Sequence, residues 1–477
     1  MGCQYHVDWP DAPVETRGRD GETTTRAFNI GHKKRPNYFE RFQNGRITTL
    51  SFDDDADGTI DEIVEMAPNN DDPHLVLILD GVPFDLVRSM YDDGRFRLFA
   101  PPIRMVSVFP SMTDLALTRI VRSKRCIAAQ SLYFDRETNR LSNGNSVYLN
   151  GKNAPWRERM HYCATQHVGA NAYLNPPFVF STELRGMYES FKKAGPGIAF
   201  AYSVGTAGLG TRGGEHAIRA YLLEIEKLCE RITYDRRGRV KISILGDHGH
   251  TLRQGRRVTF KQALTAAGFR IGASIRGPND VVPIHYGIVT YAQFHTDRAR
   301  AVADVLAKQP SVALVAFREA DRVVVQRPGA AATIGKREGG FDYDTSHGDP
   351  LELAGIIEAL QDAGHVAADD TIADRPLFDA SATHRYPDPL HRLWSCFDDL
   401  VDKPADVIAS LKPEYCHGSK FFHFFVAPIA STHGGLEYES SVTFLLTNAS
   451  REPLPAACRV DDVLDLIAQP IAERPTD

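Results

Sequence analysis

The sequence places a carboxylate beside an imidazole at a point where a buried strand is expected to end. Residues 244–249 read Ile-Leu-Gly-Asp-His-Gly, so an apolar run stops at Asp247 and His248. A second apolar run, residues 74–81, stops in the same way at Asp80. Ligands at the carboxyl ends of parallel strands meet at one edge of a sheet. Because carboxylate oxygens and an imidazole nitrogen suit Zn²⁺ or Mn²⁺, these segments predict a metal site.

Two further segments offer hydroxyl groups and a second imidazole. Residues 108–114 read Val-Phe-Pro-Ser-Met-Thr-Asp, an apolar strand followed by a turn that carries Ser111 and Thr113. Residues 431–435 read Ser-Thr-His-Gly-Gly, follow a strand expected at 422–428, and carry His433. Each segment alone also has a purely structural explanation, because Asp often caps a helix and turn hydroxyls usually bond to backbone.

In this order, the four segments resemble the alkaline phosphatase superfamily, especially its type I phosphodiesterase and nucleotide pyrophosphatase branch. The resemblance spans residues 72–470. It implies one divalent ion, Zn²⁺ or else Mn²⁺ or Mg²⁺, held by Asp80, Thr113, Asp247 and His248. It also implies that Thr113 is the nucleophile, since a nearby divalent ion strengthens a hydroxyl nucleophile at neutral pH. Ser111 is the weaker candidate for that role.

The second metal position implied by the resemblance departs from the family pattern. The family supplies an Asp-x-x-x-His pair after the strand at 197–203, together with the late histidine that matches His433. Here the corresponding positions hold Ala207 and Thr211. A catalytic zinc usually has three protein ligands, so a second ion would lack two of them. Three other histidines could compensate, although each fits an ordinary loop or capping role: His216, His250 and His347.

The surroundings of Thr113 depart from the family as well. The nucleotide pyrophosphatase branch has Asn three residues after the nucleophile, and here that residue is Ala116. Asp114 directly follows Thr113, and a carboxylate there would repel an anionic substrate unless a cation intervenes. The sulfatase branch does not fit, because Cys126 is followed by Ile-Ala-Ala-Gln rather than by its Cys-x-Pro/Ala-x-Arg motif.

The elements that would position these residues alternate between strand and helix from residue 72 onward. Strands are expected at 75–79, 103–109, 197–203, 240–246 and 312–317, and helices at 83–91 and 215–232. This alternation predicts an α/β fold with a mainly parallel sheet. The resemblance makes it an alkaline phosphatase-like sandwich over residues 72–477, with helices on both faces and an inserted subdomain considered for 250–340. Residues 1–45 are expected to be a poorly ordered arm, and residues 46–71 a β-hairpin extension.

The hairpin extension contains a run of acidic residues with the spacing of a calcium loop. Its oxygen donors are Asp53, Asp55, Asp57, Thr59 and Asp61, with Gly58 at the bend. This spacing is typical of Ca²⁺ loops. Val64 stands where an EF-hand has its bidentate Glu, and the flanking patterns indicate strands. The alternative is an acidic turn that binds nothing, and the sequence leaves both interpretations open.

Composition narrows the classes of partner. The 477 residues include 55 basic and 61 acidic side chains for a net charge of -6, which gives no basic surface for a nucleic-acid polymer. No segment approaches the ~18 apolar residues of a membrane span. Seven scattered cysteines fit a reducing compartment, so we expect a cytoplasmic protein. The expected partner is a small phosphorylated substrate or ligand, and the oligomeric state is left open.

Two functions from different classes follow. The first is a metal-dependent phosphoric ester hydrolase-like protein, a phosphodiesterase or phosphatase, with a Thr113 nucleophile and one degenerate metal site. The alternative is a catalytically silent family member that binds a phosphorylated ligand or a protein partner. A single-metal transferase or phosphonate hydrolase is a third possibility.

Overall fold

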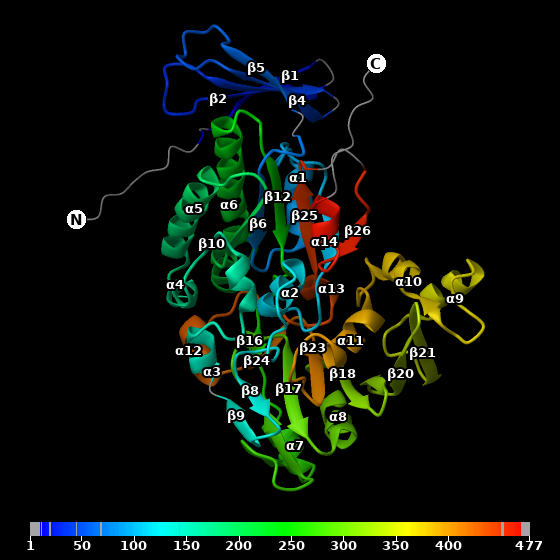
Figure 1. Cartoon of the computed structure of the whole chain (residues 1–477). Helices are drawn as coiled ribbons and strands as arrows, with labels where there is room; N and C mark the ends of the chain where they lie inside the picture. Colours follow the sequence, from blue (N-terminus) through cyan, green and yellow to red (C-terminus); the bar gives the residue numbers. More distant parts are fainter. Residues whose placement is uncertain are drawn as a thin grey trace.

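The computed structural model describes residues 10, 12–18, 21–43, 45–66, 69–142, 144–172, 174–449 and 453–468. Two large sheets lie end to end along an elongated molecule, and a small third sheet covers one end (Figure 1). The sequence motifs fall at the boundary between the two large sheets.

The central sheet has seven strands and is mainly parallel, as predicted. In spatial order the strands are β10 (Tyr162–Cys163), β11 (Ile198–Ser203), β6 (His74–Leu79), β12 (Lys241–Gly246), β25 (Val442–Thr447), β7 (Ile103–Val106) and β26 (Ala457–Arg459). Only β25 runs antiparallel to its neighbours, and the other pairs are parallel. All residues of β6 are buried, which explains its continuous apolar sequence.

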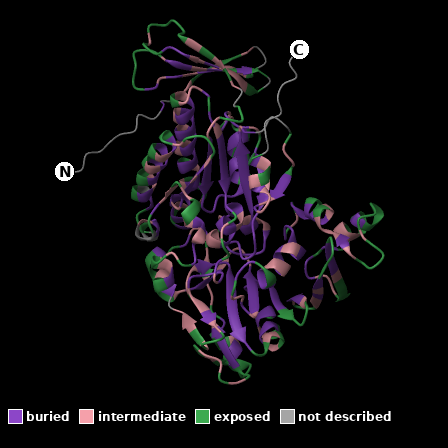
Figure 2. Ribbon diagram, viewed as in Figure 1, coloured by how far each residue is buried: buried purple, intermediate pink, exposed green. Residues whose placement is uncertain are grey.

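Helices cover both faces of this sheet, which confirms the predicted layering. The helices on one face are α1 (Phe84–Asp92), α5 (Pro176–Lys192) and α6 (Gly205–Asp235), and on the other α2 (Thr113–Ile120) and α14 (Val463–Ala468). Because strand side chains alternate between faces, Leu77 packs with the first set and Val76 and Ile78 with the second. The sheet is the continuous buried core in Figure 2.

The second sheet has nine strands. It includes strands on both sides of residue 340, the end of the inserted subdomain expected at 250–340. The strands in spatial order are β14 (Arg270–Ile271), β15 (Asp280–Pro283), β17 (Tyr291–Thr296), β23 (Val407–Leu411), β18 (Val312–Glu319), β19 (Arg322–Arg327), β20 (Ala330–Arg337), β21 (Gly340–His347) and β22 (Ile372–Ala373). Helix α8 (Ala299–Ala307) packs on one face and α11 (Pro389–Asp398) on the other. The unit therefore runs well past residue 340.

Shorter elements connect these layers. They are β8 (Tyr133–Asp135), β9 (Arg140–Ser142), α3 (Gly144–Leu149), a 3₁₀ helix (Pro155–Arg159), α4 (Gln166–Asn171), β13 (Arg256–Arg257), α7 (Lys261–Ala266), β16 (Ile288–Val289), α9 (Ala354–Asp362), α10 (Asp374–Ser381), β24 (Tyr415–Gly418), α12 (Lys420–Val426) and α13 (Tyr438–Ser441). No helix within the described ranges is long and apolar enough to cross a bilayer.

In the N-terminal region, residues 46–71 contain an antiparallel strand pair as expected, whereas described residues of the range 1–45 form strands where a poorly ordered arm was expected. Five antiparallel strands form one sheet: β1 (Val14–Arg17), β2 (Thr23–Phe28), β3 (Tyr38–Gln43), β4 (Arg46–Phe52) and β5 (Glu62–Glu65). Tyr38 and Phe52 pack against Tyr234 near the end of α6. Leu50 and Phe28 belong to the same buried cluster as these aromatic residues. The strands before residue 45 carry many polar residues, which is why no periodic pattern indicated them. Residues 1–9 lie outside the described part of the chain.

The strand expected at 422–428 is instead the short helix α12. Ser419 caps it by accepting a hydrogen bond from the Phe422 backbone N–H. Phe421 and Phe424 on this helix are 75% and 79% exposed. An aromatic run favours a strand only where a neighbouring strand can pair with it, and here the capping serine decides the local structure.

Candidate metal centre

Two neighbouring strands of the central sheet deliver the first three predicted ligands. The end of β6 at Leu79 is paired with Gly246 at the end of β12. The next residues are therefore side by side, and Asp80, Asp247 and His248 are all buried. The sequence pattern of two apolar strands that stop at ligands predicted this meeting correctly.

The donor atoms of these side chains form a compact group around the Thr113 hydroxyl. One donor atom of each of Asp80, Asp247 and His248 lies within 4.8 Å of the others. Thr113 Oγ1 lies 3.3 Å from Asp80 Oδ1 and 3.2 Å from His248 Nε2. His248 Nε2 is also 3.4 Å from Asp247 Oδ2. All four residues of the predicted first metal position are thus brought together.

The local hydrogen bonds leave two electron-pair donors of this group free to bind a cation, His248 Nε2 and Asp247 Oδ2. His248 Nδ1 lies 2.8 Å from the Gly249 carbonyl, which can only accept, so Nε2 carries the free lone pair. Asp247 Oδ1 accepts from the backbone N–H groups of Gly81 and His248. Asp247 Oδ2 is buried and has no partner within the described structure. A buried oxygen without a donor is costly, and a cation would satisfy it.

The electrostatics agree with a cation at this position. Burial raises the pKa of Asp247 to about 7, and burial together with the Asp247 charge holds the pKa of Asp80 well above its usual range. Burial lowers the pKa of His248 to about 4, so its ring is neutral near pH 7. Two buried carboxylates beside a neutral imidazole are a ligand set that lacks only positive charge.

Thr113 stands at the first residue of α2, where the backbone N–H groups of a helix point outward. Helix N-termini favour anions, so this placement suits a hydroxyl that must approach a phosphoryl group. Ser111, the weaker candidate, is fully buried, and its hydroxyl donates to the carbonyls of Val108 and Gly435. The Ser111 hydroxyl is occupied by these hydrogen bonds to backbone carbonyls. Of the hydroxyls of Ser111 and Thr113, that of Thr113 is therefore the accessible one.

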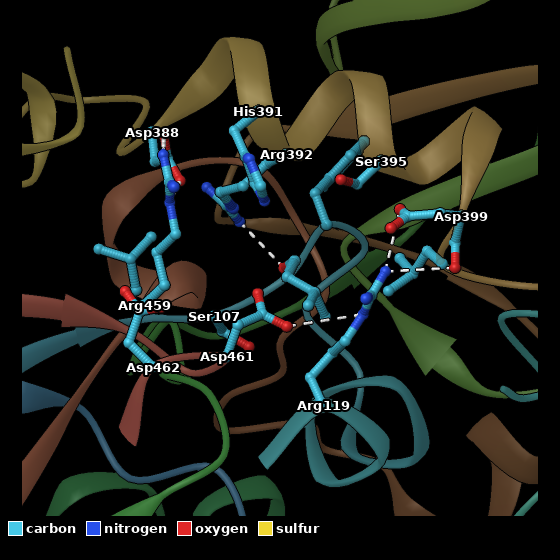
Figure 3. A pocket seen from close by; sticks show the side chains of 14 residues that line it. Ser107, Arg119, Asp388, His391, Arg392, Ser395, Asp399, Arg459, Asp461 and Asp462 are labelled. Carbon is cyan, nitrogen blue, oxygen red and sulfur yellow. Dashed lines mark hydrogen bonds and ion pairs between the residues drawn. The ribbon is translucent and has the colours of Figure 1, made fainter. Parts of the chain in front are cut away.

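The turn that carries Ser111 is supported from the second sheet by Arg392. This side chain is 2% exposed and donates to the Val108 carbonyl, the Ser111 hydroxyl and the Leu436 carbonyl. Figure 3 shows Arg392 reaching from α11 into a cavity of about 230 Å³ beside this turn. Sequence analysis did not single out Arg392, because nothing in its local pattern marks it as buried.

Tyr202 is a second residue that sequence analysis missed. Its hydroxyl donates to Asp80 Oδ2 at 2.5 Å. Tyr202 lies in β11 beside β6, paired with Ile78. One feature of the sequence could have indicated its role: Tyr202 is near the carboxyl end of a predicted central strand. Residues at that end lie at the same edge of the sheet as Asp80.

Asp114 is held away from the position where it would repel a substrate. Its oxygens accept from Trp156 Nε1 at 2.9 Å and from Asn153 Nδ2 at 3.3 Å. Burial raises the pKa of Asp114, and these two donors and Arg157 oppose the shift. Asn153 and Trp156 therefore bind the carboxylate that was expected to repel an anionic substrate.

The structure shows where the residues of the predicted second metal position lie. Ala207 and Thr211, in the first turns of α6, are 1% and 7% exposed, and the Thr211 carbonyl accepts from the Ala430 backbone near His433. The His433 ring stacks on His248 with centroids 4.0 Å apart. His433 is in no group of three metal-binding side chains within the described residues. The missing ligands are therefore not replaced by nearby carboxylates.

His250 is the one compensating histidine that the fold brings to this position. Its ring lies 5.6 Å from that of His433, and its Nε2 is buried without a partner in the described structure. The close packing also explains Gly81, which has φ +66°, since a Cβ there would lie 2.8 Å from His250. His216 and His347 are exposed, and His347 lies at the end of β21 in the second sheet.

The acidic loop between β4 and β5 folds back on its own backbone. Asp53 is 1% exposed and accepts from the N–H groups of Asp57 and Gly58. Carboxylate oxygens of Asp53, Asp55 and Asp61 lie within 4.8 Å of one another. Ca²⁺ in this loop stays a prediction, because these backbone contacts also fit the acidic turn that binds nothing.

Comparison with known proteins adds structural likenesses at low identity. No family model and no curated protein matches the chain. Matching solved structures include phosphonoacetate hydrolase from Sinorhizobium meliloti 1021 with phosphonoformate, at 12% identity and TM-score 0.48, covering 85% of this chain and 97% of that one. Murine ectonucleotide pyrophosphatase/phosphodiesterase 5 matches at 12% and 0.44, covering 84% and 97%. The human protein of that name matches at 11% and 0.44, covering 84% and 96%.

Phosphonoacetate hydrolase and the ectonucleotide pyrophosphatase/phosphodiesterases belong to the alkaline phosphatase superfamily. The murine protein has also been solved in complex with AMP.

Proposed function

We propose that this chain is a metal-dependent phosphoric ester hydrolase that works with one fully built metal position and a Thr113 nucleophile. The observation that supports the proposal is the convergence of Asp80, Asp247 and His248 on the Thr113 hydroxyl, with Asp247 Oδ2 buried and unpaired. A divalent cation would satisfy this oxygen, and the half-buried Thr113 hydroxyl lies beside it.

The residues fit a divalent cation. Asp80, Asp247, His248 and Thr113 would hold it, and the hydrogen bond from His248 Nδ1 to Gly249 fixes the tautomer needed for binding. When bound, such an ion lowers the pKa of the nucleophile and offsets negative charge on the phosphoryl group. Zn²⁺ fits best, with Mn²⁺ or Mg²⁺ as alternatives.

The chain's own residues account for the positions of the reacting groups. The Thr113 hydroxyl donates to Asp80 Oδ1, which gives its proton an acceptor. Thr113 Oγ1 then bonds to phosphorus as the ester bond breaks, and the leaving oxygen takes the electron pair. Water subsequently cleaves the phosphothreonine and restores the hydroxyl. Tyr202 holds Asp80 in place from the opposite oxygen.

The test is turnover of bis(4-nitrophenyl) phosphate and 4-nitrophenyl phosphate by protein reconstituted with Zn²⁺, Mn²⁺ or Mg²⁺. We expect Thr113→Ala to abolish turnover and to leave the fold intact. Thr113→Ser is the matched control and should retain part of the activity. The proposal is wrong if carefully prepared protein binds none of these ions and shows no turnover after reconstitution.

A catalytically silent protein that binds a phosphorylated ligand is the second candidate. Its support is the burial of Ala207, Thr211 and Ala116 at positions where the resembling family has ligands or an Asn. This candidate predicts metal binding and saturable binding of phenylphosphonate without turnover. Turnover that disappears in Thr113→Ala would refute it.

A further inference from the structure

A second cavity lies in the half of the molecule that carries the nine-stranded sheet (Figure 1). Its volume is about 300 Å³, within the range of small-molecule sites. It opens between α7, β15, β17 and β24 and shares no lining residue with the candidate metal centre.

The charged residues that line this cavity are all basic. Arg257, Lys261 and Lys420 line it, and no carboxylate does. Arg257 is engaged with the Gly418 carbonyl. Lys261 and Lys420 are exposed, and neither is in an ion pair in the described part of the chain. In a chain of net charge -6, such a local excess of positive charge favours an anion.

His417 contributes a buried atom without a partner. The residue is 1% exposed, and its Nδ1 lies 3.2 Å from the Val258 carbonyl. A carbonyl only accepts, so Nδ1 carries the proton and Nε2 carries a lone pair. Nε2 has no hydrogen-bond partner in the described structure. Burial, the nearby His285 and Arg257 lower the pKa of His417 to about 3, which keeps Nε2 an acceptor near neutral pH.

Apolar side chains make up much of the remaining lining. Phe260, Leu264 and Phe294 are buried there, and Ile271 and Pro283 also line the cavity. The rings of Phe260 and Phe294 lie 5.4 Å and 6.3 Å from the His417 ring. A ligand that fills the cavity therefore needs an apolar part for these side chains. It also needs anionic oxygens for the two lysines and a hydroxyl that donates to His417 Nε2.

We propose that this cavity binds a small organic phosphate or phosphonate as its monoanion. Two oxygens face Lys261 and Lys420, and the remaining P–OH donates to His417 Nε2. The second ionisation of a phosphate lies at about pH 6, so the monoanion is abundant just below neutrality. A sulfonate has the same shape and charge but no hydroxyl, and it leaves Nε2 unpaired.

Calorimetric titration of the full chain at pH 6 with phenylphosphonate tests this site. Chelator-treated protein is used, so that no metal ion remains at the metal centre to bind the anion. We expect one bound molecule, and Lys261→Met and Lys420→Met should each weaken binding about tenfold, as loss of a charge-assisted hydrogen bond implies. Lys308→Met, an exposed lysine at the end of α8, is the matched control and should bind normally.

The choice of probe tests the contact with His417. Benzenesulfonate should bind about tenfold more weakly than phenylphosphonate, because one buried acceptor stays unpaired. Absence of saturable phenylphosphonate binding overturns the site. Unchanged binding in the Lys261→Met, Lys420→Met double variant places the ligand elsewhere and overturns it too. Equal binding of the two probes overturns the ligand class. None of these outcomes depends on turnover.

Discussion

The two halves of the candidate centre lie against each other but differ in what fills them. In the first half, Asp80, Asp247 and His248 lie together, with Asp247 Oδ2 unpaired and a lone pair on His248 Nε2. In the second half, Ala207 and Thr211 are packed in the interior, and His433 contacts the first half through its ring. The His433 Nδ1 also lies 2.9 Å from the Ser111 carbonyl.

This difference shows that ligand loss need not damage the surrounding fold. Small or neutral residues at the start of α6 leave no buried charge, so the second half is stable without an ion. The first half keeps two buried carboxylates, which are costly unless a cation compensates them. This contrast supports the proposal that one ion binds at the first half.

Restoring the second half is the change with the largest expected effect. Ala207→Asp with Thr211→His should raise the metal content from one to two ions per chain. Turnover of 4-nitrophenyl phosphate should rise on the order of 10³-fold, since a second ion supplies several kcal/mol of charge stabilisation. Metal analysis and steady-state kinetics measure both.

Ala207→Asn with Thr211→Gln is the control for that restoration, because it changes volume without adding ligands for zinc. An unchanged metal content in the Asp/His variant would show that the two positions do not face His433 as proposed.

Removing a ligand from the first half should have the next largest effect. Asp247→Asn is expected to weaken Zn²⁺ affinity more than about 100-fold, because it removes the buried unpaired oxygen and a ligand charge. Titration calorimetry and the metal-induced rise in melting temperature report this loss. Asp114→Asn is the matched control, since Trp156 and Asn153 already bind that carboxylate. Similar losses in both variants would contradict the distinction.

Arg392→Met tests the hydrogen bonds by which one side chain connects the Val108 turn to the loop after His433. Arg392 donates both to the Val108 turn and to the Leu436 carbonyl after His433. Its removal leaves several buried acceptors without donors, which should lower the free energy of unfolding by about 2 kcal/mol. Urea denaturation measures the change, with the exposed Arg88→Met as control. An unaltered stability would show that the two loops do not need this support.

A second pair of buried carboxyl groups can be compared with the metal centre. This pair is expected to make the stability of the protein depend on pH. Glu40 of β3 and Glu230 of α6 are buried together, and burial raises the pKa of both. No histidine joins them in a metal-binding group of the described residues. Each holds a proton in the folded state that the unfolded state has lost, so stability should fall as pH rises above about 4.5.

Glu230→Gln should remove this fall and stabilise the protein by about 1 kcal/mol at pH 8. Melting temperatures between pH 4 and pH 8 measure the slope, with the exposed Glu358→Gln as control. A slope equal to that of the unaltered chain would mean that the pair does not titrate in this window. Added Zn²⁺ should leave the Glu40–Glu230 pair unaffected, in contrast to the metal centre.

The sequence by itself determined the first half of the centre and the layer that holds it. Buried strands must be apolar throughout, so Asp80 and Asp247 stand out where β6 and β12 end, and parallel pairing brings such ends together. The sequence also predicts that the second metal position lacks two ligands, because Ala207 and Thr211 stand where the resembling family has Asp and His.

Only the tertiary structure decided the contacts between distant segments. Tyr202 on Asp80, Trp156 on Asp114 and Arg392 on the Val108 turn each join residues from different elements. The same holds for His417, whose unpaired atom becomes visible only when its cavity is formed. The strands before residue 45 and the helix α12 were not predicted, for a related reason. Local pattern specifies an element only where burial is periodic, and packing against distant residues settled both cases.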